Sequence, residues 1–209
     1  MEGFKRDISA AKLYVLINNI GTNKEVLKFA RSFLEGGVDI LQLREKKLSD
    51  KDFISVSEDL QRLVADSNAI LIINDRVEIA RDIGADGVHI GQDDMSINKA
   101  REILGEESLI GVSTHNINQA VDAECCGADY IAVGPAYHTA TKDYEPVAGL
   151  DVVSEVVNKI KIPVFAIGGI KLTNLEELKS IGVNRIAVSA AIAKSENIVK
   201  ATKEFKERL

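Results

Sequence analysis

Short apolar segments that alternate with amphipathic ones predict a single-domain (β/α)8 TIM barrel for this chain of 209 residues. A weak internal repeat supports the same fold. Four times, a glycine that ends a helical stretch is followed by polar residues and then by an apolar run, and each interval between copies has room for two β-α units. Eight such units would average about 26 residues, near the lower limit for this barrel. We therefore expect one domain over residues 1–209.

The expected strands are short and almost continuously apolar, which is typical of parallel strands covered on both faces. Four of them begin in the repeat copies, at residues 36–40, 84–88, 127–131 and 182–186. The other four lie between the copies, at residues 13–18, 70–74, 109–114 and 162–167.

Amphipathic segments separate these strands and are predicted to be helices. They cover residues 25–35, 50–66, 76–83, 97–104, 117–126, 150–160, 173–181 and 190–205. An open doubly wound sheet is the alternative architecture. We favour the barrel because the dinucleotide-binding motif GxGxxG is absent from the sequence.

Amino-acid composition and net charge argue against several classes of function. The formal net charge of −6 argues against a nucleic-acid-binding surface, so an anion site should be a local cluster. Cys125 and Cys126 are the only cysteines, and adjacent residues are poorly placed for a mutual disulfide, so we expect packing roles in a reducing cytoplasm. No apolar stretch resembles a signal region or a membrane span. We expect a cytoplasmic protein without nucleic-acid or membrane partners.

Polar side chains and glycines gather at the carboxyl ends of seven of the eight expected strands, which is where barrel enzymes place their chemistry. The second strand is the most informative. Gln42, Arg44 and Lys46 alternate with Leu43 and Glu45, so the first three share one face. Two cations and an amide are costly to bury without an anionic partner. The strand therefore predicts an anion pocket, with Glu45 on the other side in solvent or in a salt bridge.

Two carboxylates, Asp75 and Asp94, follow neighbouring strands and are expected to share a cation. Carboxylates with few other protein ligands suit Mg²⁺, which keeps several waters and binds phosphate oxygens. The alternative is that each carboxylate caps the helix that follows it. Arg44, Lys46 and Lys142 favour the metal site, because three cations beside a metal ion imply a polyanion such as a diphosphate.

A second anion site is expected where the seventh and eighth strands end, at Gly168-Gly169 and Val188-Ser189. Barrels bind phosphate at this place, and paired glycines let a ligand approach backbone N–H groups. The alternative is a tight turn.

Single polar residues near the strand ends are less specific. Ser113, Thr139 and Thr141 offer hydroxyl groups for a phosphate or a heterocycle, although such residues are more often turn formers. His89 lies within a strand and is expected to be a hydrogen-bonded histidine of the barrel interior. No Ser-His-Asp arrangement or His/Cys metal cluster is evident in the sequence, so covalent catalysis is not expected.

Seven motifs resemble those of the thiamine-phosphate synthase family: in order, QLREK, IIND, GVHIGQDD, GVSTH, GPAYHTATK, AIGGI and AVSA. The resemblance implies a transferase that joins 4-amino-2-methyl-5-(diphosphooxymethyl)pyrimidine to 4-methyl-5-(2-phosphoethyl)thiazole, or to its 2-carboxy form. The products would be thiamine phosphate and diphosphate. One Mg²⁺ per subunit and a homodimer are also implied. His138 departs from the proline that is common before the first threonine, and Asp93 replaces a common glutamate.

The resemblance also implies roles by position. The pyrimidine diphosphate would contact Gln42, Leu43, Arg44, Glu45, Lys46, Asn74, Ser113 and Lys142. Of these, the catalytic residues would be Arg44, Lys46, Ser113 and Lys142. The thiazole phosphate would contact Thr139, Ala140, Thr141, Gly169, Val188 and Ser189. Mg²⁺ would be bound by Asp75 and Asp94.

The implied reaction needs no nucleophilic side chain. The amino-substituted ring can spread positive charge as diphosphate departs, and the thiazole nitrogen already has a free lone pair, so we expect a dissociative substitution. The protein would stabilise the leaving group and hold the two rings in line. Gln42 suits the second task, because an amide both donates and accepts hydrogen bonds.

Two other functions remain open. A thiazole tautomerase of the same superfamily would use the second anion site but would need no diphosphate-metal site. A non-catalytic thiamine-phosphate sensor on the same barrel would be expected to lose the leaving-group residues first.

Overall fold

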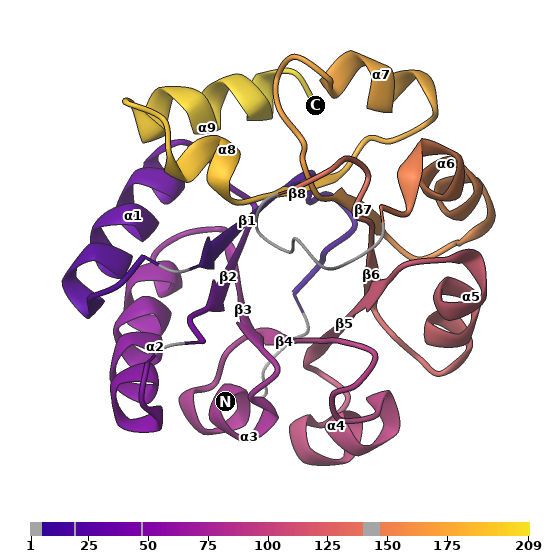
Figure 1. Cartoon of the computed structure of the whole chain (residues 1–209). Coiled ribbons are helices and arrows are strands. Elements are labelled where there is room, and N and C mark those ends of the chain that lie inside the picture. The colour runs from indigo at the N-terminus through magenta and orange to yellow at the C-terminus, as the bar shows by residue number, and fades with distance from the viewer. Residues whose placement is uncertain (1–5, 19, 47, 140–146) are drawn as a thin grey trace.

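The computed structural model describes residues 6–18, 20–46, 48–139 and 147–209. The described strands form a closed parallel barrel in sequence order, and the last strand pairs back onto the first. Figure 1 looks along the barrel axis, with the strands as the inner ring and the helices around it. The predicted (β/α)8 architecture is confirmed.

The elements alternate along the chain. The strands are β1 (Leu13–Asn18), β2 (Ile40–Arg44), β3 (Ile70–Asn74), β4 (Gly87–Ile90), β5 (Leu109–Thr114), β6 (Tyr130–Val133), β7 (Val164–Ile167) and β8 (Ile186–Val188). The helices are α1 (Asn23–Glu35), α2 (Asp50–Ala65), α3 (Val77–Ile83), α4 (Ile97–Leu104), α5 (Ile117–Cys125), α6 (Gly149–Lys159), α7 (Leu175–Ser180), α8 (Ala190–Ala193) and α9 (Ile198–Glu207).

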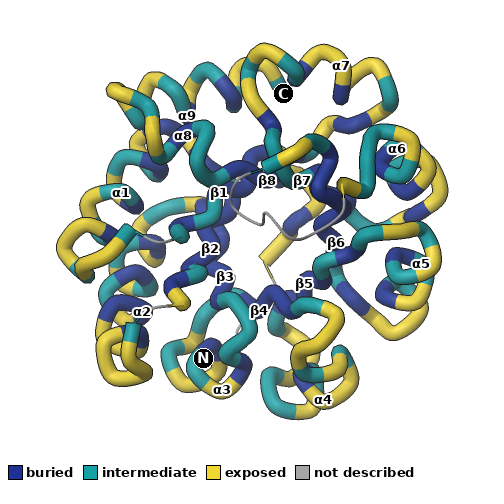
Figure 2. Tube along the Cα trace, in the orientation of Figure 1, coloured by how far each residue is buried: buried dark blue, intermediate teal, exposed yellow. Residues whose placement is uncertain are grey.

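Two apolar layers hold the barrel together, because alternate strand residues face the interior or the helices. Tyr14, Tyr130 and Phe165 belong to the interior cluster. Leu41 and Leu43 belong to the larger cluster that packs with the helices. Figure 2 shows the buried residues concentrated on the strands and on the inner faces of the helices.

The sequence repeat has a structural role at the amino ends of the strands. Asp39 precedes β2, and its carboxylate accepts hydrogen bonds from the backbone nitrogens of Lys12 and Leu13, both at 2.8 Å. Asp86 precedes β4 and accepts from the nitrogen of Leu71 in β3 at 2.8 Å. Each carboxylate satisfies a backbone donor of the preceding strand that would otherwise be costly to bury. In these copies, an aspartate just before one strand caps the beginning of the preceding strand. This contact recurs every two β-α units, which is the period of the sequence repeat.

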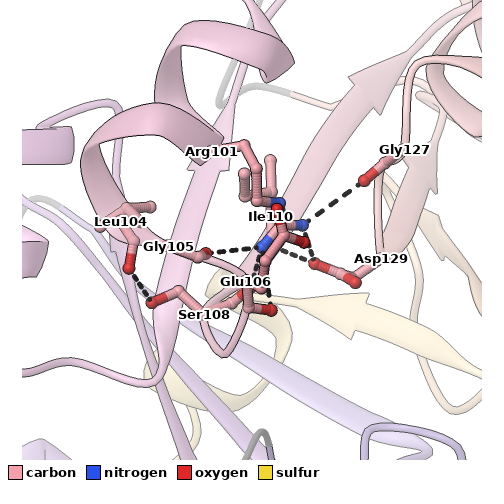
Figure 3. Close-up of polar contacts among 8 residues, drawn as sticks. All are labelled: Arg101, Leu104, Gly105, Glu106, Ser108, Ile110, Gly127 and Asp129. Carbon is pink, nitrogen blue, oxygen red and sulfur yellow. Dashed lines mark hydrogen bonds and ion pairs between the residues drawn. The ribbon is translucent and has the colours of Figure 1, made fainter.

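The third copy of the repeat is reinforced by Arg101 of α4 (Figure 3). Its guanidinium lies 2.7 Å from the carboxylate of Asp129 and donates to the carbonyl oxygens of Gly105, at 3.1 Å, and Ser108. Asp129 also accepts from the nitrogen of Ile110 at 2.8 Å. Both charged side chains are 16% exposed. The cluster joins the α4–β5 loop to the start of β6.

Replacing Arg101 with alanine is expected to lower the free energy of unfolding by about 2–4 kcal/mol, because Asp129 would keep a largely buried charge without its cation. Urea unfolding followed by circular dichroism measures this change. Arg62→Ala is the control, since Arg62 is 69% exposed in its pair with Asp59, and it should cost less than about 1 kcal/mol. Equal losses in the two variants would contradict the structural role of Arg101.

Two predicted boundaries are wrong. The single helix expected over residues 190–205 is two helices, α8 and α9. Asn197 begins α9, since its side chain accepts a hydrogen bond from the nitrogen of Lys200 at 2.9 Å. β7 begins at Val164, later than expected, because Pro163 has no N–H to donate within a sheet.

The predicted packing role of the two cysteines is also wrong. Cys125 and Cys126 are free and exposed, whereas Ala120 and Ala123 form the buried face of α5. Within the described ranges, no helix has the combination of length and apolar character needed to cross a membrane.

Candidate active site

A pocket of about 210 Å³ lies beside the carboxyl ends of β2 and β3. Charged side chains dominate its lining, which consists of Arg44, Glu45, Lys46, Phe53, Asn74, Asp75 and Arg76. Five of these seven residues are among those predicted from the sequence; Phe53 and Arg76 are not. The structure thus brings together two of the three predicted anion-binding cations, Arg44 and Lys46, and one predicted metal ligand, Asp75.

Arg44 is the last residue of β2 and its positive charge is directed to the pocket. It pairs in register with Asn18, the last residue of β1, and its Nη1 donates to the Oδ1 of Asn18 at 3.1 Å. This partner is a neutral amide, so it positions the guanidinium without neutralising its charge. Asn18 was not predicted as a site residue, although its place at a strand end opposite Arg44 is a usable signal.

The strand alternation predicted for residues 42–46 applies only as far as β2 extends. Gln42 is 2% exposed and lies inside the barrel. Leu43 packs toward the helices, so only its backbone could contact a ligand in the pocket. Glu45 is only 3% exposed and accepts a hydrogen bond from the nitrogen of Ile20 at 2.6 Å. Of the two expectations for Glu45, solvent is wrong, because β2 ends at Arg44 and the alternation ends there too, while a salt bridge stays a prediction.

Asp75 follows β3 in a conformation that is unusual for a side chain other than glycine. Its φ is 52°, in the left-handed region, and its Oδ2 accepts from the Nδ2 of Asn74 at 2.7 Å. Burial raises the pKa of Asp75, and the negative charge of Asp94 raises it further, while Lys46 and Arg76 lower it. The two carboxylates therefore lie near enough for the charge of Asp94 to act on Asp75.

Neither carboxylate caps the helix that follows it. The Oδ2 of Asp94 accepts from the nitrogen of Gly91 at 2.7 Å, and Ser96 caps α4 instead. The residue before α3 is Arg76, with no side-chain capping bond. The capping alternative is thus contradicted for both carboxylates.

The donor set fits a hard cation. Asp75 and Asp94 offer carboxylate oxygens, and charge repulsion between them would be relieved by a cation. Across the residues that the structure describes, no group of three or more His, Cys, Asp or Glu side chains forms a cage for a metal. A two-carboxylate site suits an ion that takes its remaining ligands from water and a phosphorylated substrate.

Arg76 is the main residue that the sequence analysis missed. Its guanidinium lies 4.1 Å from the centroid of the Phe53 ring and 2.9 Å from a carboxylate oxygen of Asp50. It contributes positive potential beside Asp75. Its position directly after Asn74 and Asp75 at a strand end is the signal that would have identified it.

Ser113 and His89 meet inside the barrel near the carboxyl ends. The Nε2 of His89 lies 2.9 Å from the Oγ of Ser113, and its Nδ1 lies 3.2 Å from the hydroxyl of Tyr130. His89 is 6% exposed. The prediction that His89 is a hydrogen-bonded interior histidine is confirmed.

The second predicted anion site contains two left-handed glycines. Gly168 has a φ of 96° and Gly169 a φ of 65°. A Cβ on Gly168 would lie 2.5 Å from the Cβ of Pro135, and one on Gly169 would lie 2.7 Å from the Cβ of Tyr137. These glycines are thus required for the close approach of the loop after β6.

The remaining residues of the second site are only partly described. Ser189 donates to the carbonyl oxygen of Leu16 at 3.0 Å, and the side chain of Val188 is buried. Thr139 is half-buried in the loop after β6. Ala140, Thr141 and Lys142 lie outside the described residues.

Fold and site together define the class of protein, a (β/α)8 barrel enzyme with a pocket of charged side chains at the carboxyl ends of its strands. The family model described as thiamine monophosphate synthase matches residues 13–192. The chain belongs to this family.

Curated relatives and solved structures agree with this assignment. The chain is 40% identical over 194 residues to a thiamine-phosphate synthase of Clostridium novyi, covering 92% of this chain and 95% of the relative. It is 40% identical over 200 residues to one of Methanobrevibacter smithii, covering 94% of this chain and 96% of the relative. The structure of thiamine phosphate pyrophosphorylase from Pyrococcus furiosus superposes with a TM-score of 0.85 at 34% identity, covering 94% of each chain. A 3-hexulose-6-phosphate synthase shares the fold alone, at 19% identity and a TM-score of 0.75, with 95% of this chain and 99% of that chain covered.

Proposed function

We propose that this protein joins 4-amino-2-methyl-5-(diphosphooxymethyl)pyrimidine to 4-methyl-5-(2-phosphoethyl)thiazole and releases diphosphate, or joins it to the 2-carboxy form of the thiazole and releases diphosphate and CO2. The observation that carries the proposal is the grouping of Arg44, Lys46, Asp75 and Arg76 around one pocket. Three cations beside a carboxylate suit a metal-bound polyanion better than a single phosphate. Membership of the thiamine monophosphate synthase family supports the same substrates.

In the proposed reaction, the side chains stabilise charge and hold geometry. Arg44, Lys46 and Lys142 would bind the diphosphate more strongly as its negative charge grows, which lowers the barrier to its departure. Gln42 and Ser113 would position the pyrimidine ring in the barrel interior. With both rings aligned, the thiazole nitrogen attacks the freed carbon centre without a general base. The substitution is proposed to be dissociative.

Asp75 and Asp94 would hold Mg²⁺. When bound, the ion would share the negative charge of the diphosphate oxygens. Asp75 sits at the pocket in a strained conformation, which is a common property of residues at functional sites.

The thiazole phosphate is proposed to lie nearer β6, β7 and β8. Its contacts would come from Thr139, Ala140, Thr141, Gly169, Val188 and Ser189. Gly169 would offer its backbone N–H, as would Val188, whose side chain is buried. Small-molecule substrates, a cytoplasmic location, a homodimer and the absence of nucleic-acid partners stay predictions.

Mixing the protein with both substrates is expected to release diphosphate, and EDTA is expected to stop the release. A coupled assay for inorganic diphosphate measures both results, and excess Mg²⁺ added after EDTA should restore activity. A thiazole tautomerase would release no diphosphate and would convert a carboxythiazole phosphate alone. A sensor would bind thiamine phosphate without release. Either outcome would contradict the proposed function.

A further inference from the structure

A chain of buried hydrogen bonds crosses the barrel interior from β2 to β5. The Nε2 of Gln42 bonds the hydroxyl of Tyr14, which lies 3.1 Å from the hydroxyl of Tyr130. That hydroxyl lies 3.2 Å from the Nδ1 of His89, whose Nε2 lies 2.9 Å from the Oγ of Ser113. Five strands contribute one residue each, and we call these five residues the interior chain. Its two ends, Gln42 and Ser113, are both predicted to contact the pyrimidine substrate.

The interior chain is packed so that its groups cannot turn freely. Tyr14 is 1% exposed and Tyr130 is fully buried. Their rings stack edge-to-face on Phe165, with centroid distances of 5.5 Å for Tyr14 and 5.8 Å for Tyr130. Gly111 makes room for the Tyr130 ring, since a Cβ there would lie 2.0 Å from a ring carbon. The hydroxyl groups are therefore held in place by the surrounding core.

The number of protons allows the hydrogen bonds only two directions along the whole interior chain, of which the first begins at the amide nitrogen of Gln42. Burial raises the pKa of Tyr14 and of Tyr130 well above the ordinary value, so each hydroxyl keeps its one proton. Gln42 donates to Tyr14, so Tyr14 donates to Tyr130, and Tyr130 donates to the Nδ1 of His89. If the His89 imidazole is neutral, its proton lies on Nε2 and is donated to Ser113. The hydroxyl proton of Ser113 is left to bond a ligand.

The opposite direction is possible only if every bond reverses together. Ser113 would then donate to His89, His89 to Tyr130, Tyr130 to Tyr14, and Tyr14 to the oxygen of Gln42. A reversal partway along would leave a buried hydroxyl proton without an acceptor or would place two donors face to face, which is unfavourable in a dry interior. If Gln42 accepts a hydrogen bond from a ligand, Ser113 must therefore donate one, and if Gln42 donates, Ser113 must accept.

In the structure, Gln42 has the orientation of the first direction, with its Nε2 on the Tyr14 hydroxyl. Its Oε1 is buried and has no hydrogen-bond partner among the described residues. A buried acceptor of this kind is stabilised by a donor from a ligand. The next inward-facing residue along β2 is Arg44, which lines the pocket. A ligand in the pocket can therefore extend an N–H group toward Gln42.

We propose that the interior chain makes Gln42 an acceptor and Ser113 a donor toward the substrate, and thereby selects a pyrimidine that carries an amino group over one that carries an oxo group. Tyr14, Tyr130 and His89 act as positioning residues that set the orientation of the two ends. The inference rests on the proposed function and identifies the feature of the substrate that the site recognises.

The test compares two diphosphate substrates, the 4-aminopyrimidine and its 4-oxo analogue, by the ratio of their kcat/KM values. Tyr14→Phe and Tyr130→Phe interrupt the interior chain and free the Gln42 amide to rotate. We expect the ratio to fall at least about tenfold in both variants. Tyr137→Phe is the matched control, because its hydroxyl bonds Glu177 at 2.8 Å, outside the interior chain, and its ratio should equal that of the unmodified protein.

The outcomes separate this inference from the proposed function. If the unmodified protein releases no diphosphate from the amino substrate, the proposed function fails. If the unmodified protein is active, but Tyr14→Phe and Tyr130→Phe lower kcat/KM equally for the two substrates, the tyrosines are only structural and the inference is overturned.

A second measurement needs neither activity nor a stable tyrosine variant. Nitrogen-15 NMR of histidine-labelled protein reports which ring nitrogen carries the proton. The chain has three histidines, and His115→Gln and His138→Gln identify their signals, which leaves that of His89. A neutral ring protonated on Nε2 supports the proposed direction. A proton on Nδ1, or on both nitrogens at neutral pH, would overturn it.

Discussion

Replacing Arg44 with alanine is expected to lower kcat/KM for diphosphate release about 10- to 150-fold. One charge-assisted hydrogen bond is worth roughly 1.5–3 kcal/mol, and each 1.36 kcal/mol lost from the transition state costs about a factor of ten. Stability should change little, because Arg44 bonds the neutral amide of Asn18 and not a carboxylate of the fold. Steady-state kinetics and thermal unfolding of the same preparation measure both effects.

Two further variants make the Arg44 experiment specific. Arg44→Lys keeps the charge but not the forked donor geometry, so its activity should lie between those of the native protein and the alanine variant. Arg31→Ala removes an exposed arginine from α1 and should leave both kinetics and stability unchanged. Full activity of Arg44→Ala would show that Arg44 does not bind the leaving group. Loss of folding in that variant would show that its role is structural.

The second large effect is expected from Asp75→Asn, which should lower activity at least about 100-fold while stabilising the metal-free protein. The metal site would lose one of two carboxylates, and a lost metal ligand is rarely replaced by a neutral amide. The backbone should be preserved, because asparagine tolerates the left-handed φ of 52°. The loss of activity is measured by diphosphate release at saturating Mg²⁺.

The stabilising effect follows from the raised pKa of Asp75, caused first by burial and then by the charge of Asp94. The folded protein binds this proton more tightly than the unfolded chain, so the carboxylate penalises folding increasingly as the pH rises from the unfolded pKa through the folded one. Above that range the penalty is fully present, and below it the penalty is absent. Asp75→Asn should therefore raise the Tm at neutral pH in EDTA, and the gain should disappear near pH 3.

In the presence of Mg²⁺ the native protein should have the higher Tm of the two, since the ion stabilises it by binding the folded state and should not stabilise Asp75→Asn. A change of 1 kcal/mol corresponds to roughly 2–4 °C in Tm for a domain of this size. Asp122→Asn on α5 is the control for removing an exposed carboxylate and should shift the Tm little. If Asp75→Asn were less stable than the native protein without metal, the carboxylate would be a structural anchor and not a metal ligand.

Much of the site followed from local rules. Arg44, Asn74 and Asp75 were identified because they end apolar strands, and the carboxyl ends of parallel strands meet at one face of a barrel. Arg76 and Asn18 also stand at strand ends, so the same rule could have identified them. No local pattern shows the partner that each contacts on another element, Phe53 for Arg76 and Arg44 for Asn18.

Glu45 and the last helix mark where local rules fail. Strand alternation predicts Glu45 in solvent or in a salt bridge, but the chain leaves β2 one residue earlier and the carboxylate accepts a hydrogen bond from the nitrogen of Ile20. The apolar period continues through residues 190–205, but Asn197 begins a new helix there, because its side chain supplies a cap. Both errors arise where a specific hydrogen bond overrides a periodic pattern.

By itself, the sequence determined the number and order of the strands and the closed barrel, and it predicted where the site lies, because hydrophobic periodicity and strand polarity are encoded residue by residue. Only the tertiary structure decided that Asp75 interacts with Asp94, and that Gln42 and Ser113 are joined through Tyr14, Tyr130 and His89. The physical reason is closure of the barrel. It brings residues more than 100 positions apart within hydrogen-bonding distance, as for Tyr14 and Tyr130, and the direction of those bonds is set by all of their partners together.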